Sequence, residues 1–525
     1  MDASCLRHTE IPHTSKLFLD FQYQFDRVKS YYDWWPGDPE SYAKATQQID
    51  FPADRRAALV SVLRERNGDS PSLALLAQPG TVAVVTGQQT GLFSGPAYTV
   101  YKALSAVRLA EQLTRQGIPA VPIFWLATED HDLAEVNHCY VFGRDRQPVR
   151  LQANGQGEPQ QPVGTIGLGD PPVEELRRIL EPFPFGEEIS GMVAQAYRPE
   201  ADFGDSCEQL LRKLLGKWGL LFVNPLDQGL RSIAAPMLRN ALLHAPELKR
   251  LILERNKALE KDGYHAQVHI EAGTSLFFVL DGKRRITLKR QDNEYVSKER
   301  RYSTDDLASR AEQLSPNALL RPVVQDYMLP TIAYVGGPAE LAYLAQSQVI
   351  YHELLGRMPV VLARCSFTLL DARAHKLMSR YGLGLPCFFH GEECLREKIA
   401  KKLVPDSILQ EFQEIEKTTA SSLDRLRSDL TAFDPTLGAA MDKSRSKILF
   451  QLAKLERKAA RESLRRDARA SEESRFLSGL IFPEKHLQER FYSMLPFLAQ
   501  HGLGLLDTLY DATNLECTDH KILTV

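Results

Sequence analysis

The chain has 525 residues, of which 43% are hydrophobic and 25% are charged. These are ordinary globular values that argue against general disorder, and the length predicts roughly two to four structural units. The formal net charge of −3 provides no global field that would steer the protein onto nucleic acid or an anionic membrane.

Cysteine usage and the apolar runs indicate the compartment. The seven cysteines are irregularly spaced and include no CxxC pair, so we expect a reducing compartment without a disulfide framework. The N-terminus lacks the basic and apolar regions of a signal peptide. Apolar runs such as 120–127 are too short to span a bilayer. We therefore expect a soluble, cytoplasmic protein that binds neither membrane nor nucleic acid.

The first part of the chain changes from helical to βαβ character. Residues 1–75 are predicted to be mostly helical, with a loop at 35–39. The apolar, β-branched run 81–86 is typical of a buried strand. It is followed by a glycine-rich turn at 87–96, a helix from 98 to about 116 and a second buried strand at 120–126. This order predicts a parallel sheet with right-handed crossovers.

Later segments can join the same sheet. The pattern predicts strands at 219–223, 331–335 and 359–363, with helices at 203–218, 230–243 and 339–356. The expected fold class is therefore α/β, with a Rossmann-like parallel-sheet core over 1–389. Two segments, at about 140–190 and 264–315, break the parallel pattern and are predicted to be insertions. The second contains Asp281-Gly282 between alternating runs, which is a strong hairpin signal.

Residues 390–474 are predicted to form a long antiparallel helical hairpin. Apolar residues recur there at steps of three or four among charged residues, and Asp434-Pro435-Thr436 interrupts the pattern. Two thin helices cannot cover their own apolar surface, so we expect a homodimer formed through this coiled coil. Alternatively, the hairpin braces its own chain. Residues 475–525 are predicted to be helices that return to the core.

A glycine-rich turn follows the first predicted strand. Glycines and a helix start at this point suit an anion such as phosphate or carboxylate, although the spacing matches neither GxGxxG nor GxxxxGK[ST]. The alternative is a tight turn with no ligand. The candidate binding residues are Gly87, Gln88, Gln89, Thr90, Gly91, Gly95 and Lys102.

An acidic turn, Glu129-Asp130-His131-Asp132, follows the second strand. Four ionisable residues at the end of a buried strand are costly unless they face a cleft. His131 could transfer a proton near neutral pH, and the carboxylates could bind an ammonium group or Mg²⁺. These four are the candidate catalytic residues. The alternative is a solvated helix cap in which Asp132 is the N-cap residue.

A third polar stretch surrounds the predicted strand 331–335, where glycines again separate a strand from a helix. The candidates there are Arg321, Gln325, Asp326, Gly336, Gly337, Glu340 and Tyr343. Arg321 could pair a carboxylate or phosphate bidentately, or it could form an ordinary salt bridge. Neither His390 with Cys394 nor His138 with Cys139 supplies four zinc ligands, so no metal site is assigned.

Four segments carry a family resemblance: TGQQTGLFSGPAYTVYK (86–102), PIFWLATEDHDLAEVNH (122–138), SPNALLRPVVQDYMLPTIAYVGGPAELAY (315–343) and ARCSFTLLD (363–371). Together they resemble the BshC family. The resemblance implies a Rossmann-type core with connecting-peptide insertions and a coiled-coil hairpin used in dimerisation. It further implies the last step of bacillithiol biosynthesis, in which L-cysteine is added to glucosaminyl-malate. The central cleft would then be lined by candidates from all three turns, together with Asn137.

The core also resembles nucleotidylyl-transferring class I synthetases, but it lacks their HxGH-like histidine pair and KMSKS-like loop. The main hypothesis is a cysteine ligase that uses ATP as co-substrate, with an ammonium group or Mg²⁺ bound at the acidic turn. A second hypothesis is a nucleotidyl- or glycosyl-transferase that uses the same cleft. The third is a non-catalytic, nucleotide-binding coiled-coil dimer.

Overall fold

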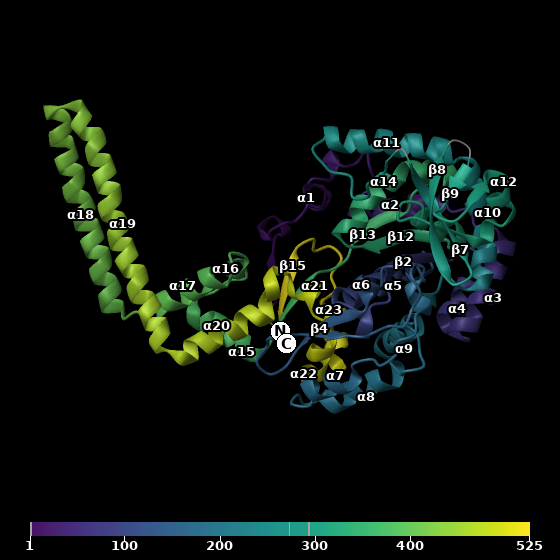
Figure 1. The fold of residues 1–525 in the computed structure, drawn as a ribbon, viewed down its shortest axis with the longest axis horizontal. Coiled ribbons are helices and arrows are strands. Elements are labelled where there is room, and N and C mark those ends of the chain that lie inside the picture. Colours follow the sequence, from purple (N-terminus) through teal and green to yellow (C-terminus); the bar gives the residue numbers. More distant parts are fainter. Residues whose placement is uncertain (1–2, 272, 292–293) are drawn as a thin grey trace.

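The structure is a computed structural model that describes residues 3–271, 273–291 and 294–525. Residues 1–2 of the predicted core, and 272 and 292–293 of the predicted insertion 264–315, lie outside the described residues. A body that contains the sheets lies on the right of Figure 1, and two long helices project from it to the left. The N- and C-terminal ends lie beside each other in the middle of this view.

The centre of the body is a sheet of five parallel strands, as predicted. Its members are β2 (Val82–Gln88), β3 (Ala120–Leu126), β6 (Leu221–Val223), β12 (Thr331–Gly336) and β13 (Val360–Ala363), in the order β13-β12-β2-β3-β6. All four neighbouring pairs are parallel. The strands are almost wholly buried, which explains why they are continuous apolar runs rather than alternating ones.

Helices cover both faces of this sheet. Alternate residues of β2 point to different cores: Ala83 and Val85 pack in one apolar cluster, and Val82 and Val84 in another. Helix α5 (Tyr98–Arg115) packs against β2 and β3. The other helices of the βαβ layers are α9 (Phe203–Leu215), α10 (Gln228–Leu243) and α14 (Pro338–Leu355), close to their predicted ranges.

The strand order creates a switch point. The chain begins the sheet at β2, builds outward through β3 and β6, and then returns to the other side of β2 with β12 and β13. The connections that leave β2 and β12 therefore diverge at their carboxyl ends. In open parallel sheets, this is where a crevice forms and ligands bind.

The remaining elements before the hairpin frame this core. The N-terminal helices are α1 (Lys16–Tyr23), α2 (Pro39–Gln47), α3 (Ala53–Asn67) and α4 (Pro71–Leu76). The segment predicted as an insertion at 140–190 contains the pair β4 (His138–Phe142) and β5 (Pro148–Gln152), then α7 (Val173–Leu180) and α8 (Gly186–Ala196). Next come α11 (Ala245–Lys261), α12 (Thr304–Ser309) and α13 (Arg321–Met328).

The second predicted insertion forms an antiparallel sheet. Its strands are β7 (Thr274–Asp281), β8 (Arg284–Gln291), β9 (Glu294–Val296), β10 (Arg301–Ser303) and β11 (Leu314–Pro316). Strands β7 and β8 pair across Asp281 and Arg284, which confirms the hairpin predicted at Asp281-Gly282. Gly282 has a φ of +59°, a backbone conformation that glycine adopts readily.

The predicted helical hairpin is confirmed. Helices α15 (Ala372–Tyr381), α16 (Pro386–Phe389) and α17 (Glu392–Lys402) lead to α18 (Asp406–Phe433), which pairs with α19 (Pro435–Arg466). Asp434 ends the first long helix, and its side chain caps the second by accepting a hydrogen bond from Thr436 N. No residue of α18 is buried. The antiparallel pair is therefore a thin, solvated arm (Figure 1).

The C-terminal elements pack in the largest apolar core, as expected. They are α20 (Ala468–Ile481), α21 (Gln488–Phe491), α22 (Leu495–His501), α23 (Gly504–Ala512) and β15 (His520–Thr524). Strand β15 lies between β1 (Ala3–Leu6) and β14 (Phe367–Leu370) in a small sheet that joins the two ends of the chain. Within the described ranges, no helix is long and apolar enough to cross a membrane.

Candidate functional site

A cavity of about 490 Å³ lies at the carboxyl edge of the central sheet. The turns after β2, β3 and β12 all contribute to its wall, as the switch point requires. The prediction that Gln88 and His131 lie over one sheet edge is therefore confirmed. The predicted residues that line this cavity are Gly87, Gln88, Gln89, Lys102, Glu129, Asp130, His131, Arg321, Gly337, Glu340 and Tyr343.

Lys102 joins the first and third turns. Its ammonium group donates to Gly87 O at 3.0 Å and Gln88 Oε1 at 2.7 Å, and lies 2.5 Å from Glu340 Oε2. These contacts use all three ammonium protons, and the side chain is only 3% exposed. Lys102 therefore holds the cavity wall in place, and it can bind a ligand only by giving up one of these partners.

Glu340 is the matching anchor on the third turn. Besides Lys102, it accepts hydrogen bonds from Gly337 N at 2.7 Å and Tyr334 OH at 2.8 Å. Burial opposes its ionisation, but Lys102 and the Gly337 N–H hold the pKa of the Glu340 carboxyl below its ordinary value. Glu340 therefore stays ionised and fixes the start of α14.

The carboxylates of the acidic turn have different kinds of partner. Glu129 Oε1 lies 2.8 Å from Arg231 Nη1, and both side chains are almost fully buried. Asp130 accepts hydrogen bonds from His131 N at 2.7 Å and from Gln89 Nε2 at 2.7 Å. Because Glu129 is already neutralised by Arg231, Asp130 is the carboxylate of this turn that can best accept a proton or an ammonium group.

His131 has a partner from the inserted sheet. Arg285, on β8, places its Nη1 3.2 Å from His131 Nδ1 and stacks its guanidinium 3.7 Å from the centre of the Phe278 ring. A guanidinium has only donors, so Nδ1 of His131 must accept, and the ring proton sits on Nε2. Burial and Arg285 both lower the pKa of His131. His131 is therefore a neutral imidazole with an Nε2–H donor.

Three further arginines line the cavity, Arg321, Arg364 and Arg490. Arg321 donates to Gln325 Oε1 at 3.0 Å and to Tyr343 OH at 2.7 Å. Arg364 forms a buried, two-bond pair with Glu489, at 2.6 and 2.9 Å, while its Nε is buried without a hydrogen-bond partner in the described structure. Because Glu489 balances the charge of Arg364, Arg321 and Arg490 are the cationic groups of this set that a ligand can best pair with.

Eight predicted site residues do not line the cavity, and the prediction is corrected for them: Thr90, Gly91, Gly95, Asp132, Asn137, Gln325, Asp326 and Gly336. Asp132 is the exposed N-cap of the short helix α6 (Leu133–Val136), and Asn137 is its C-cap. The helix-cap alternative therefore holds for Asp132.

The other corrected residues are structural supports. Gly91 and Gly95 pack so closely that a Cβ at Gly91 would lie 3.0 Å from Gly95 Cα. Thr90 is buried within the same turn. Gln325 accepts a hydrogen bond from Arg321, and Asp326 accepts a hydrogen bond from Tyr351 OH at 2.6 Å within the core. Gly336 lines a neighbouring cavity.

Sequence reasoning missed several lining residues: Tyr98, Phe278, Arg285, Asn317, Tyr334, Arg364 and Arg490. Arg285 lies in a segment that was interpreted only as a carried insertion, and Arg490 lies in the C-terminal region assigned to the core. No local pattern points to either residue, because each reaches the cavity through long-range packing. Tyr98, Tyr334 and Arg364 lie within or beside the predicted strand-to-helix turns, so their proximity was a usable signal.

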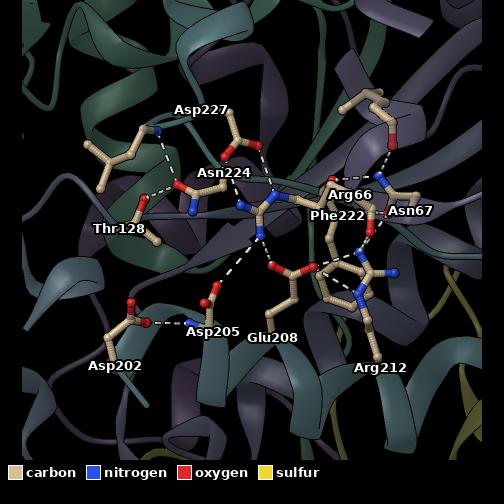
Figure 2. Close-up of polar contacts among 12 residues, drawn as sticks. Arg66, Asn67, Thr128, Asp202, Asp205, Glu208, Arg212, Phe222, Asn224 and Asp227 are labelled. Atoms are coloured by element: carbon tan, nitrogen blue, oxygen red, sulfur yellow. Dashed lines mark hydrogen bonds and ion pairs between the residues drawn. The ribbon is translucent and has the colours of Figure 1, made fainter. Parts of the chain in front are cut away.

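A second polar network includes Thr128, the residue that directly precedes the acidic turn (Figure 2). Thr128 Oγ1 donates to Asn224 Oδ1 at 2.5 Å, which joins the ends of β3 and β6. Asp227, three residues further on, is held by Arg66 through two hydrogen bonds at 2.7 and 2.8 Å. On the other side, Gly164 packs so tightly on Thr128 that a Cβ would lie 2.3 Å from its side chain. Contacts of Thr128 with both Asn224 and Gly164 therefore fix the start of the acidic turn.

The acidic turn offers little to a resident metal ion. In the part of the chain that the structure describes, no group of three His, Cys, Asp or Glu side chains could hold one. The Glu129 carboxylate is paired with Arg231, and Asp132 caps a helix. The side chains present therefore do not fit a resident Mg²⁺, and we derive no step from one.

A Rossmann-like sheet with a charged cavity at its switch point, joined to a coiled-coil arm, defines a protein of the α/β class. Family models match nearly the whole chain. Residues 1–365 match the N-terminal Rossmann-like domain of bacillithiol biosynthesis BshC, and 367–525 match its C-terminal coiled-coil domain. The chain therefore belongs to the BshC family.

Relatives agree with this family over their full length. A protein of Solibacter usitatus is 51% identical over 525 residues and covers all of both chains. One of Koribacter versatilis is 36% identical, also over all of both chains, and one of Salinibacter ruber is 31% identical over 97% of this chain and 96% of its own. Each of the three is named "Putative cysteine ligase BshC".

Proposed function

We propose that this chain joins L-cysteine to glucosaminyl-malate by an amide bond, the last step of bacillithiol synthesis. Membership of the BshC family and the names of its relatives support this ligase activity. The observation that carries the proposal is the set of charged side chains that share one cavity. Asp130 and His131 line it together with Arg321, Arg364 and Arg490.

The arginines of the cavity suit the malate part of the acceptor. Malate carries two carboxylates, and arginine recognises carboxylates through paired, charge-assisted hydrogen bonds. Arg321 and Arg490 line the cavity, and the start of α14 adds the positive end of a helix. A carboxylate bound here would accept hydrogen bonds from these guanidinium groups. The glucosamine amine would then extend toward Asp130 and His131.

Asp130 and His131 suit the reacting amine and the carbonyl that it attacks. A free carboxylate resists attack, so the cysteine carboxylate must first be activated, and ATP is the proposed co-substrate. The amine nitrogen then forms the new C–N bond, the activating group departs with its electron pair, and the amine releases a proton. Asp130 is the proposed proton acceptor. His131, neutral and protonated at Nε2, would donate a hydrogen bond to the carbonyl oxygen as negative charge develops.

The helical arm supports a further part of the proposal, a cytoplasmic homodimer. Apolar side chains on α18 and α19 stay exposed, and Phe433 at the tip is 84% exposed. A second copy is the occupant we propose for this surface, because an antiparallel helix pair with unburied seam residues can be covered by another pair. The exposed residues are Ile408, Ile415, Leu426, Phe433, Leu437, Ile448, Phe450 and Leu455.

The test supplies purified protein with L-cysteine, glucosaminyl-malate and ATP, and measures bacillithiol by mass spectrometry. We expect product with the native chain. His131→Gln should lower kcat about 100-fold or more, which is the usual loss when a donor to a developing oxyanion is removed. The unfolding midpoint should change little, because His131 is partly exposed.

His269→Gln is the matched control, because His269 is strongly exposed and does not line the cavity. It should keep full activity. Absence of bacillithiol with every nucleoside triphosphate tried would reject the ligase proposal. Equal activity of His131→Gln and His269→Gln would reject the role of His131. Consumption of glucosaminyl-malate and nucleotide without cysteine would indicate a transferase instead.

A further inference from the structure

The two ends of the chain bring a pair of thiols together. Cys5 lies on β1, and Cys517 lies in the loop between α23 and β15. Their sulfur atoms are 3.7 Å apart, although 512 positions separate the two residues. Figure 1 shows the two ends of the chain side by side, and β1 pairs with β15 in antiparallel register. Folding, rather than sequence proximity, therefore makes this pair.

Hydrogen bonds hold the Cys517 loop against α1. Tyr23 OH donates to Asp519 Oδ1 at 2.8 Å, and it accepts from His8 N, just after β1, at 2.8 Å. Gln22 Nε2 donates to Thr518 O at 3.2 Å. One tyrosine thus ties both segments that carry the cysteines. The two sulfurs are held as neighbours, which is the arrangement that disulfide formation requires.

The pair is accessible and lies near a positive charge. Cys5 is exposed and Cys517 is partly exposed, whereas Cys139, Cys207 and Cys365 are buried. Lys521 is paired with Cys5 in the β1–β15 register, and its charge favours the thiolate. Burial and the neighbouring Cys517 act more strongly and raise the pKa of Cys5. Exchange should therefore become faster as the pH rises.

We propose that Cys5 and Cys517 are a redox modification site that takes a low-molecular-weight disulfide as its oxidant. One thiolate attacks the small disulfide, forms a mixed disulfide and releases one small thiolate. The second cysteine thiolate then attacks the protein sulfur of the mixed disulfide. This step forms the Cys5–Cys517 bond and releases the second small thiolate. The protein pair loses two electrons and two protons, and the small disulfide is reduced to two thiols.

The bond would be a reversible staple between the chain ends. Disulfides in reducing compartments are usually transient and redox-sensing, which fits a pair that is accessible to reagents. The segment after β1, from His8 to Ser15, lines a cavity of about 500 Å³ that shares Gly337 and Arg364 with the site cavity. The staple would tie this segment to the C-terminal strand. This inference does not depend on the proposed ligase activity.

The experiment incubates the native chain with oxidised glutathione at pH 8 and maps its peptides without reduction. We expect one cross-linked peptide pair that contains Cys5 and Cys517 and has two hydrogens fewer than the separate peptides. Dithiothreitol should reverse it. On a non-reducing denaturing gel, the oxidised chain should migrate faster, because a closed loop of this size is more compact. Oxidation should also raise the unfolding temperature by reducing the entropy of the unfolded chain.

The variants Cys5→Ser and Cys517→Ser should lose the cross-link and the gel shift. Cys394→Ser should keep both, because Cys394 lies in α17 within the arm-proximal helices. Two results would overturn the proposal: glutathione adducts on Cys5 and Cys517 without an internal cross-link, or a cross-link between Cys517 and Cys365. Mapping of the native chain needs no variant, so a variant that fails to fold does not prevent the decision.

Discussion

The site cavity and the helical arm are both rich in charge, but they place that charge in different surroundings. Around the cavity, the pairs Glu129–Arg231 and Arg364–Glu489 have less than a tenth of each side chain exposed. On the arm, the pair Arg427–Asp442 is about half exposed. Buried charges must be fully partnered to be tolerated, whereas water partners the exposed ones. Charge therefore fixes geometry in the cavity and mainly favours solubility on the arm.

Lys102 should show the largest effect on stability. Lys102→Met leaves the largely buried Glu340 carboxylate without its cation, and breaking a buried pair typically costs about 3–5 kcal/mol. We expect the free energy of unfolding to fall by that amount in urea titrations. The control is Lys44→Met, whose pair with Glu40 is mostly exposed and should contribute little to stability. Similar losses in the two variants would remove the distinction between buried and exposed pairs.

Acid should weaken the small sheet that joins the chain ends. Burial lowers the pKa of both His8 and His520 to about 4. Between pH 6.5 and 4, these histidines bind protons in the unfolded chain but not in the folded one, so stability falls as the pH falls through that window. The loss should reach a few kcal/mol.

Urea midpoints at pH 7.5 and pH 5 measure this loss. The pKa of Glu489 is lowered to about 2, so the stability that its ionised form contributes is lost only when the pH falls below the ordinary value near 4.5. Glu489 therefore does not contribute to a loss of stability between pH 7.5 and pH 5. His520→Gln should reduce the difference between the two midpoints. An unchanged difference would show that His520 is not one of the groups responsible.

Arg285 should control the protonation of His131. Arg285→Gln removes a positive charge and the donor to Nδ1, so the pKa of His131 should rise toward its ordinary value. Two-dimensional ¹⁵N NMR of the imidazole reports both pKa and tautomer. Arg284→Gln is the matched control, because Arg284 pairs with Glu299 instead. If the two variants gave the same His131 titration, Arg285 would have no such role.

The smallest effect is expected on the arm. Arg427→Ala removes two hydrogen bonds to Asp442. Because both side chains are about half exposed, the free energy of unfolding should fall only slightly, and by less in high salt. Urea titrations at low and high salt measure this. A loss comparable to that of Lys102→Met would contradict the contrast between arm and cavity.

Strand positions and the meeting of the three turns could be predicted from the sequence, because each depends on short patterns. Apolar β-branched runs specify buried strands, and parallel strands bring their carboxyl ends to one edge. His131 and Gly337 therefore came together as expected. The partners of these residues could not be predicted. Whether Arg285 or Arg490 reaches the cavity depends on how an inserted sheet and a C-terminal helix dock, and no local periodicity records that.

The side chains of the polar stretches were predicted less well than their backbones. A helix start fixes where Gln325 and Asp326 lie along the chain, but the direction of each side chain depends on its turn of α13. Arg321 turns toward the cavity, while Asp326 turns toward Tyr351 in the core. The approximate position of a site can thus be inferred from strand ends. Which side chains line it can be known only once the orientation of the packed helix is known.

The inserted antiparallel sheet forms part of the cavity wall. Phe278 and Arg285 come from its β7 and β8, and its edge strand β11 runs directly into Asn317 on the cavity wall. A rigid shift of this one sheet would change the shape of the cavity and at the same time move the Arg285 guanidinium relative to the His131 imidazole. The shape of the cavity and the pKa of His131 would then both depend on the position of this sheet.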